Sequence, residues 1–258
     1  MSQKFNVARI VGRTDHTPTL FSLQFDAAID PFIAGQFCRL GLVLPAADVA
    51  TNEDIVMRAY SLVNAPDERP HEIVLSQVDA AMGGVLTPHL HALKVGDTLC
   101  VSPRVNGYFS MPEVPDADVL WALSTGTAIG PFLSILKTDA PWQKFRRIVL
   151  VHAVRHAAEL CYRDQIALIA AAHPSRLIYI PFVSREVFLG AIQGRIPAAI
   201  VNGQLEARAG VTLSADTAHC MLCGNPDMVR DTMAVLQARG LRKHRPKHPG
   251  HITVEAYW

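Results

Sequence analysis

Residues 119–136 read VLWALSTGTAIGPFLSIL, a run of 18 residues without a charged side chain. A run of this length could cross a bilayer as one helix. However, the Ser, Thr, Gly and Pro residues in its middle are typical of a turn. We therefore expect a buried strand over 119–123, a sharp turn, and then the first turns of a helix.

The turn between this strand and this helix has features of a phosphate site. Backbone N–H groups at a helix start and the positive end of the helix dipole both attract anions. Gly126 and Gly130 would let a ligand approach the backbone, and Thr125 and Thr127 add hydroxyl donors. The stretch does not match G-x-x-x-x-G-K-[ST] or G-x-G-x-x-G. By itself it leaves open a phosphate site and a purely structural turn.

Strand and helix patterns alternate through the rest of the C-terminal half. Further strands are expected at 147–153, 176–183 and 219–223. Helices are expected over 159–172 and after Asn225, which can cap a helix whose first residue is Pro226 and which Gly240 ends. This alternation is typical of a parallel sheet with helices on its faces.

The N-terminal half has a different pattern, with short β-like runs separated by turn residues. These runs cover 7–13, 19–26, 36–44, 58–64, 72–78 and 97–104. Six such runs indicate an antiparallel barrel or sandwich. One helix interrupts them at 88–93, where Leu86, Leu90 and Leu93 share a face. A proline-bearing linker follows, so we expect domains at 1–110 and 111–258.

Composition excludes several classes of protein. Half of the 258 residues are hydrophobic, which suits a large core, and a net charge of +1 gives no general attraction to nucleic acid or membranes. Five scattered cysteines do not suggest a secreted disulfide framework, and the start lacks the apolar core of a signal peptide, so we expect a cytoplasmic protein. Cysteine and histidine spacings fit no standard metal site, and we expect no metal.

Residues 58–64, RAYSLVN, lie on an expected barrel strand. Alternation places Tyr60 and Ser61 on opposite sides, so a ligand that touches both must lie at a strand end or bend. The pattern R-x-Y-S-x-x-[SN] resembles the flavin signature of the ferredoxin–NADP reductase family, most of all its bacterial ferredoxin (flavodoxin) members. Eight segments follow the family order: 34–42, 58–64, 124–136, 149–155, 183–186, 194–197, 221–232 and 249–258.

The resemblance covers essentially the whole chain and implies an oxidoreductase with two cofactors. An N-terminal six-stranded antiparallel barrel would bind FAD, and a C-terminal Rossmann-like α/β domain would bind NADP(H). NADPH would give a hydride to the flavin, and electrons would then pass singly to ferredoxin or flavodoxin. A monomer is expected. Two alternatives remain: a flavin reductase or oxygenase-partner reductase of the same fold, and a non-catalytic nucleotide-binding redox sensor.

The resemblance also implies roles for the flavin residues. Arg58 would bind the flavin phosphate, Tyr60 would pack on the ring, and Ser61 would hydrogen-bond its reactive nitrogen. Tyr257 would cover the outer face of the flavin and Trp258 would lie under the adenine. Further FAD contacts are implied for Leu62, Val63, Val85, Leu86, Thr87 and Thr127. From the residues alone, Thr87 followed by Pro88 could also be a purely structural cap and helix start.

On the nucleotide side, the resemblance places Arg155, Arg185 and Arg195 at the 2′-phosphate of NADP(H). Guanidinium groups suit a phosphate because they offer planar forks of donors. Ion pairs with Glu159 or Glu186 remain the alternative. Ser184, Gly126 and Thr127 are further expected NADP contacts.

Cys223 and Gly224 would lie near the nicotinamide, with Cys223 shaping the pocket rather than acting as a general nucleophile. Glu255 would be an acid near the flavin, a candidate for proton relay, and joins Tyr60, Ser61, Tyr257 and Cys223 in the expected catalytic set. The basic run at 242–250, RKHRPKHPG, is either a solvated loop or a docking site for an acidic carrier.

Overall fold

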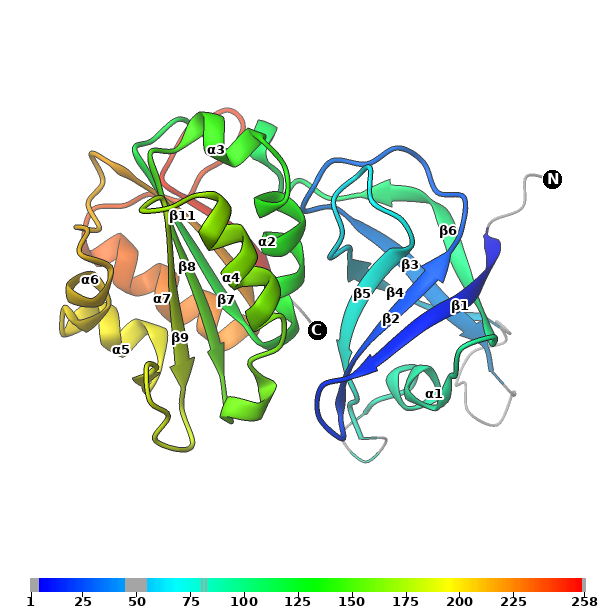
Figure 1. Cartoon of the computed structure of the whole chain (residues 1–258). Helices are drawn as coiled ribbons and strands as arrows, with labels where there is room; N and C mark the ends of the chain where they lie inside the picture. Colours follow the sequence, from blue (N-terminus) through cyan, green and yellow to red (C-terminus); the bar gives the residue numbers. More distant parts are fainter. Residues whose placement is uncertain (1–4, 45–54, 80, 82, 257–258) are drawn as a thin grey trace. The chain divides into compact units, whose positions relative to one another are not determined.

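The computed structural model describes residues 5–44, 55–79, 81 and 83–256. The chain divides into two compact units, Met1–Tyr108 (unit 1) and Phe109–Trp258 (unit 2). Each unit contains one six-stranded sheet with its own buried core (Figure 1).

The sheet of unit 1 is antiparallel throughout its paired strands. It consists of β1 (Asn6–Asp15), β2 (Leu20–Asp26), β3 (Phe37–Val43), β4 (Ile55–Ser61), β5 (His71–Ser76) and β6 (Thr98–Asn106). The strand order is β4-β3-β6-β1-β2-β5, and the two end strands β4 and β5 also contact each other. The sheet therefore curls into a barrel, and all six expected strands are confirmed.

One α-helix, α1 (Thr87–Ala92), packs on this barrel. Leu86, Leu90 and Leu93 contact the barrel core, as their shared face predicted. The expected capping role of Thr87 is wrong, because the helix starts at Thr87 and no side chain caps it. The Thr87 hydroxyl instead accepts a hydrogen bond from the amide of Val78, with a distance of 3.0 Å. It therefore ties the helix start to the segment that follows β5.

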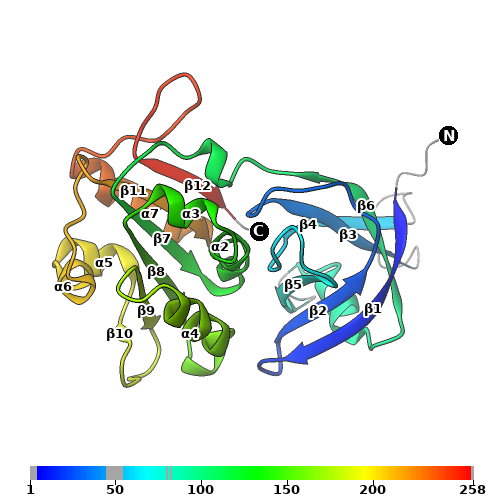
Figure 2. The ribbon, with the colours of Figure 1, turned by 45° about the horizontal axis from the view of Figure 1, so that its top comes forward.

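The sheet of unit 2 is parallel. It consists of β7 (Val119–Thr125), β8 (Arg147–Val154), β9 (Leu177–Val183), β10 (Ile192–Gln193), β11 (Ala218–Gly224) and β12 (Ile252–Ala256). The four long strands were expected, and the edge strands β10 and β12 were not. Figure 2 shows β10 and β12 at opposite ends of the row of strands. The antiparallel barrel followed by a parallel α/β domain confirms the expected fold class.

Helices cover both faces of this sheet (Figure 1). They are α2 (Ile129–Leu136), α3 (Ala140–Lys144), α4 (Arg163–Ala172), α5 (Ile196–Val201), α6 (Gln204–Ala209) and α7 (Pro226–Ala238). Every residue of β7 except Thr125 is buried, which fits a strand covered on both faces. Among the described residues, no helix is long and apolar enough to cross a membrane.

Two helix expectations can be compared with the structure. Asn225 caps α7 as expected, because its side chain accepts hydrogen bonds from two amides of the first turn. The expected helix over 159–172 is wrong at its start, because α4 begins only at Arg163. Glu159 belongs instead to a short 3₁₀ helix, Ala157–Glu159, and Tyr162 has a left-handed backbone (φ 61°) that separates the two.

The strand order of unit 2, β10-β9-β8-β7-β11-β12, reverses direction between β7 and β11. Successive strands β8, β9 and β10 lie on one side of β7, whereas β11 and β12 lie on the other. In open α/β sheets, ligands bind at such a switch point, beyond the carboxyl ends of the strands. The fold therefore directs attention to the residues that follow β7 and β11.

Candidate nucleotide and flavin sites

The turn after β7 combines an open approach with an anchored backbone. Gly126 has φ 56°, and a Cβ placed on it would meet no atom within 4 Å. Its carbonyl oxygen accepts two hydrogen bonds, from the Ile129 amide and from Nε2 of His152 at 3.0 Å. Open space beside a half-buried turn at a helix start suits the approach of a phosphate.

A second turn, after β11, contacts the first across the switch point. The amide of Asn225 donates a hydrogen bond to Oγ1 of Thr125, at 2.9 Å. Gly224 has φ 137°, and a Cβ on it would lie only 2.1 Å from the same oxygen. Glycine is therefore required at position 224, both for its backbone conformation and for the close approach.

Cys223 and Glu255 face each other at the carboxyl ends of β11 and β12. The Cys223 sulfur lies 3.9 Å from Oε2 of Glu255, and Cys223 is fully buried. Burial raises the pKa of Glu255 to about 7. A carboxyl group with this pKa can hold or release a proton near neutral pH, and a relay role for Glu255 stays a prediction.

The three arginines follow three neighbouring strands of the sheet. Arg185 donates its amide hydrogen to the carbonyl of Arg155 at 2.9 Å, so the ends of β8 and β9 are joined. Arg195 immediately follows Gly194, whose amide bonds to the last residue of β9. All three arginines are exposed. The structure therefore brings together at one sheet edge residues that are 40 positions apart in the sequence.

Ser184 lies beside the first two arginines. Its amide and its hydroxyl both donate to the carbonyl of Val154, at 3.1 and 3.2 Å. The hydroxyl therefore links the ends of β8 and β9, and an additional contact with a nucleotide stays a prediction.

The acidic neighbours of these arginines bond to backbone amides. Glu159 Oε2 accepts hydrogen bonds from the amides of Arg155 and His156, at 2.8 and 2.9 Å. Glu186 Oε1 accepts one from Ala157, at 2.6 Å. Within the described part of the chain, no ion pair joins the Arg155, Arg185 or Arg195 side chain to a carboxylate. The alternative of ion pairs with Glu159 or Glu186 is therefore not observed.

In unit 1, the expected flavin motif lies at the end of β4. Ser61 is the last residue of this strand, so a ligand at the strand end could touch both Tyr60 and Ser61. Tyr60 packs against the barrel core, and burial raises its pKa to about 12, so the phenol stays protonated. Arg58 is exposed, and its Nη1 donates only to the carbonyl of Met57 among described groups.

Leu62 and Val63 are core residues with no exposed surface. Their amides already donate to the carbonyls of Gln36 and Glu72, at 3.2 and 2.9 Å. Flavin contacts of Leu62 and Val63 stay a prediction. The expected flavin roles of Tyr257 and Trp258 lie outside the described residues.

The second flavin segment, at 83–90, has one open and one tightly packed glycine. A Cβ on Gly83, which has φ 84°, would meet nothing within 4 Å, whereas one on Gly84 would lie 2.0 Å from the Val78 carbonyl oxygen. Val85 is 40% exposed, and Leu86 is buried in the core. An exposed backbone ahead of a helix start fits the approach of a phosphate here as well.

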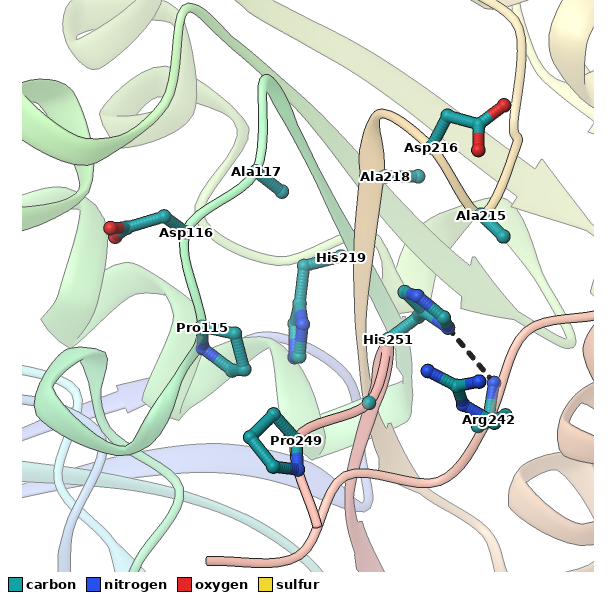
Figure 3. A pocket seen from close by; sticks show the side chains of 11 residues that line it. Pro115, Asp116, Ala117, Ala215, Asp216, Ala218, His219, Arg242, Pro249 and His251 are labelled. Carbon is teal, nitrogen blue, oxygen red and sulfur yellow. Dashed lines mark hydrogen bonds between the residues drawn. The ribbon is translucent and has the colours of Figure 1, made fainter.

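A cavity of about 280 Å³ lies at the opposite edge of the unit 2 sheet, where β11 begins (Figure 3). His219 and His251 line it together with Arg242, whose amide donates to Nδ1 of His251 at 3.0 Å. His219 bonds to Thr253 through Nε2, and burial lowers its pKa to about 3. Among described residues, no cluster of metal-ligating side chains occurs here or elsewhere.

His152 lies in an apolar strand, and no sequence motif points to its side chain. A single histidine inside an apolar strand gives no signal of a functional position, and its partner, the Gly126 carbonyl, is a backbone group 26 positions away. Only the register of β7 and β8, which pairs Ser124 with His152, brings the two together.

Comparisons with known proteins agree with this geometry. The model of the oxidoreductase NAD-binding domain matches residues 122–234. Flavodoxin/ferredoxin–NADP reductases of Escherichia coli and Shigella flexneri are each 44% identical over 243 residues, which cover 94% of this chain and 94% of each relative. The crystal structure of a ferredoxin NADP+ reductase from Neisseria gonorrhoeae with bound FAD and NADP covers all of both chains, with a TM-score of 0.89 and 28% identity. The chain belongs to the flavodoxin/ferredoxin–NADP reductase family of oxidoreductases.

Proposed function

We propose that this protein oxidises NADPH and reduces ferredoxin or flavodoxin, with FAD bound by unit 1 and NADP(H) bound by unit 2. Family membership over nearly the whole chain supports this function, as does a relative of the same fold with both cofactors bound. One observation carries the choice of nucleotide: three exposed arginines follow adjacent parallel strands, beside an open glycine turn.

The arginines would hold the 2′-phosphate, which distinguishes NADPH from NADH. Arg155 and Arg185 are joined through their backbones, so their guanidinium groups start from a fixed spacing. Gly126 and Thr127 would hold the pyrophosphate at the start of the helical segment, where amides lack partners within the helix. Cys223 and Gly224 would adjoin the nicotinamide at the switch point.

Bound FAD supplies the conversion of a two-electron hydride into single electrons. Arg58 would bind its phosphate, together with the backbone at Val85–Thr87, while Tyr60 would pack on the ring and Ser61 would donate to it. Glu255, with its pKa near 7, would exchange a proton near the flavin. Tyr257 and Trp258 would stack on the ring and the adenine.

We assign residues 1–110 to the FAD domain and 111–258 to the NADP(H) domain, and we propose a monomer that works in the cytoplasm. The compact units, which meet between residues 108 and 109, support this division. Five free cysteines, all of them buried, fit a reducing compartment.

Anaerobic reduction of the purified protein tests this function. We expect a yellow protein that releases FAD on denaturation, is bleached by NADPH much faster than by NADH, and then reduces added ferredoxin or flavodoxin. A colourless protein without extractable flavin would contradict the oxidoreductase function. Equal rates with NADH and NADPH would contradict the arginine assignment alone.

A further inference from the structure

We propose that His152 is a positioning residue for NADP(H): its Nε2–H holds the Gly126 carbonyl so that the next amide, that of Thr127, points toward the pyrophosphate. This inference rests on the proposed function, since it requires the turn after β7 to bind NADP(H). It concerns a residue that touches no substrate atom and acts only through the backbone of the turn.

The hydrogen bond fixes which ring nitrogen carries the proton. A carbonyl oxygen only accepts hydrogen bonds, so Nε2 of His152, 3.0 Å from the Gly126 oxygen, must be the donor. Nδ1 is then the unprotonated nitrogen, and it is buried without a partner among the described groups. The bond from Nε2 to the Gly126 carbonyl is therefore the one polar contact of this ring among the described groups.

The ring is held in this neutral form. His152 has no exposed surface, and burial lowers its pKa to about 4. At physiological pH it therefore places one donor at a fixed position and adds no charge. Its position is determined by β8, whose register pairs His152 with Ser124 of β7.

The planar peptide group transmits this anchor to the next residue. In a trans peptide, the carbonyl oxygen and the following N–H point in opposite directions. The Gly126 carbonyl points inward to His152 and to the Ile129 amide, so the N–H of Thr127 points away from them. The Cα of Gly126 borders open space, which leaves room for a ligand at this turn.

Gly126 also explains why such an anchor is needed. Glycine adopts both signs of φ at little cost, so the φ of 56° at Gly126 is weakly fixed by its own residue type. Without the imidazole, the peptide between Gly126 and Thr127 keeps only the Ile129 bond, and its N–H can turn away from the phosphate.

A pair of matched variants tests this role. His152→Gln places an amide N–H at the position of Nε2, whereas His152→Asn is one methylene shorter and does not reach Gly126. Isothermal titration calorimetry on the FAD-loaded proteins measures two affinities, for NADP+ and for adenosine 2′-monophosphate. The second ligand has the 2′-phosphate but no pyrophosphate.

We expect His152→Asn to weaken NADP+ binding about tenfold, the value of one well-placed hydrogen bond. Binding of adenosine 2′-monophosphate should stay within twofold of wild type, and His152→Gln should restore most of the NADP+ affinity. If His152→Asn does not fold, His152→Met fills the space without a hydrogen-bond donor. We expect this variant also to weaken NADP+ binding while leaving the affinity for adenosine 2′-monophosphate unchanged. Arg185→Ala should instead weaken both ligands.

His219→Asn is the control for loss of a buried histidine. His219 is as buried as His152 and lies in the same sheet, but near the start of β11 and therefore at the other edge. We expect it to lower the melting temperature without separating the two affinities. Equal weakening of both ligands by His152→Asn, or no weakening of either, would overturn the inference. If the wild type bound neither ligand, the proposed function itself would fail.

Discussion

The two candidate phosphate segments are built alike but receive their charged partners differently. In both, a left-handed glycine borders open space, Gly126 in unit 2 and Gly83 in unit 1, and a helical segment follows. Each is tied down by a side-chain hydrogen bond, from His152 in one and to Thr87 in the other. In unit 2 the charges come from distant segments, whereas in unit 1 Arg58, Tyr60 and Ser61 share one strand.

Strand direction explains this difference. All strands of a parallel sheet end at the same edge, so residues after β8, β9 and β10 gather although they are far apart in sequence. In an antiparallel barrel, neighbouring strands end at opposite edges. A single strand must then supply several ligand contacts, and a short local motif results.

The largest effect is expected from the double variant Arg155→Ala, Arg185→Ala. Each charged hydrogen bond contributes about 1.5–3 kcal/mol, so the kcat/KM for NADPH should fall at least a hundredfold. The value for NADH should change less than threefold, and FAD content should not change. Stopped-flow reduction of the flavin by each nucleotide measures this. A parallel loss with NADH would mean that the arginines act on the fold and not on the phosphate.

The glycines of unit 2 should respond very differently to alanine. Gly224→Ala should lower the free energy of unfolding by about 3 kcal/mol, because it adds backbone strain and a Cβ 2.1 Å from Thr125. In Gly126→Ala the new Cβ contacts no atom, so only the backbone strain of about 1 kcal/mol should reduce stability. NADP+ binding should nevertheless weaken, because the methyl group fills the open space through which the phosphate would approach. Urea unfolding and calorimetry separate the two effects. Equal destabilisation would contradict the open space at Gly126.

In unit 1, Thr87→Val removes the hydroxyl that ties the helix start to Val78. The loss of a partner for this amide should lower the free energy of unfolding by about 1 kcal/mol and weaken FAD binding severalfold. Thr87→Ser keeps the hydroxyl and should restore both. Flavin fluorescence on dilution measures the affinity. If Thr87→Val kept full FAD affinity, this segment would not contact the cofactor.

The smallest effect is expected from Glu255. Its folded pKa of about 7 lies above the ordinary value of 4.5, so the folded state binds the extra proton and this contribution to stability is lost as the pH rises from 4.5 to 7. Glu255→Gln should remove this loss and stabilise the protein at pH 8 by about 1 kcal/mol or less, since the group is half-buried and partly screened. Denaturation at pH 5 and pH 8 measures the difference.

The buried histidines His71, His152 and His219 give the opposite pH dependence and serve as an internal reference. The lowered pKa values of His152 and His219 mean that stability is lost as the pH falls below 6.5. The two pH windows overlap between pH 4.5 and 6.5, so the sign of the slope separates the groups: Glu255→Gln should remove the loss of stability with rising pH and keep the loss with falling pH. The opposite result would contradict the assignment of these groups.

The sequence predicted the features that depend on local pattern. Short β-like runs between turn residues indicated all six barrel strands. Apolar runs followed by helix patterns indicated the four long strands of unit 2, and Asn225 with Pro226 marked the start of α7. The strand β10 has only two residues and β12 has five, too few for a clear pattern. Tyr162 precedes α4 with a left-handed backbone, which a helical periodicity does not show.

Residue chemistry and motif order similarly suggested a phosphate-binding role for the arginines. They did not predict the hydrogen bonds that hold the surrounding backbone. Arg155 and Arg185 could be proposed to bind a phosphate from the sequence alone. Only the structure shows that the carboxylates of Glu159 and Glu186 accept hydrogen bonds from backbone amides. Thr87 was expected as a cap because its type is common there, yet its hydroxyl bonds to a neighbouring loop. His152 was missed because its partner is a carbonyl oxygen, which every residue carries.

The hydrogen bond between Asn225 and Thr125 spans 100 positions of the chain. During synthesis, Thr125 leaves the ribosome several seconds before Asn225, because translation adds about 5–20 residues per second. The β7 turn can form early, but its neighbour across the switch point arrives only when β11 has been added. A nascent chain therefore completes this pair of turns late, after most of the second unit has been synthesised.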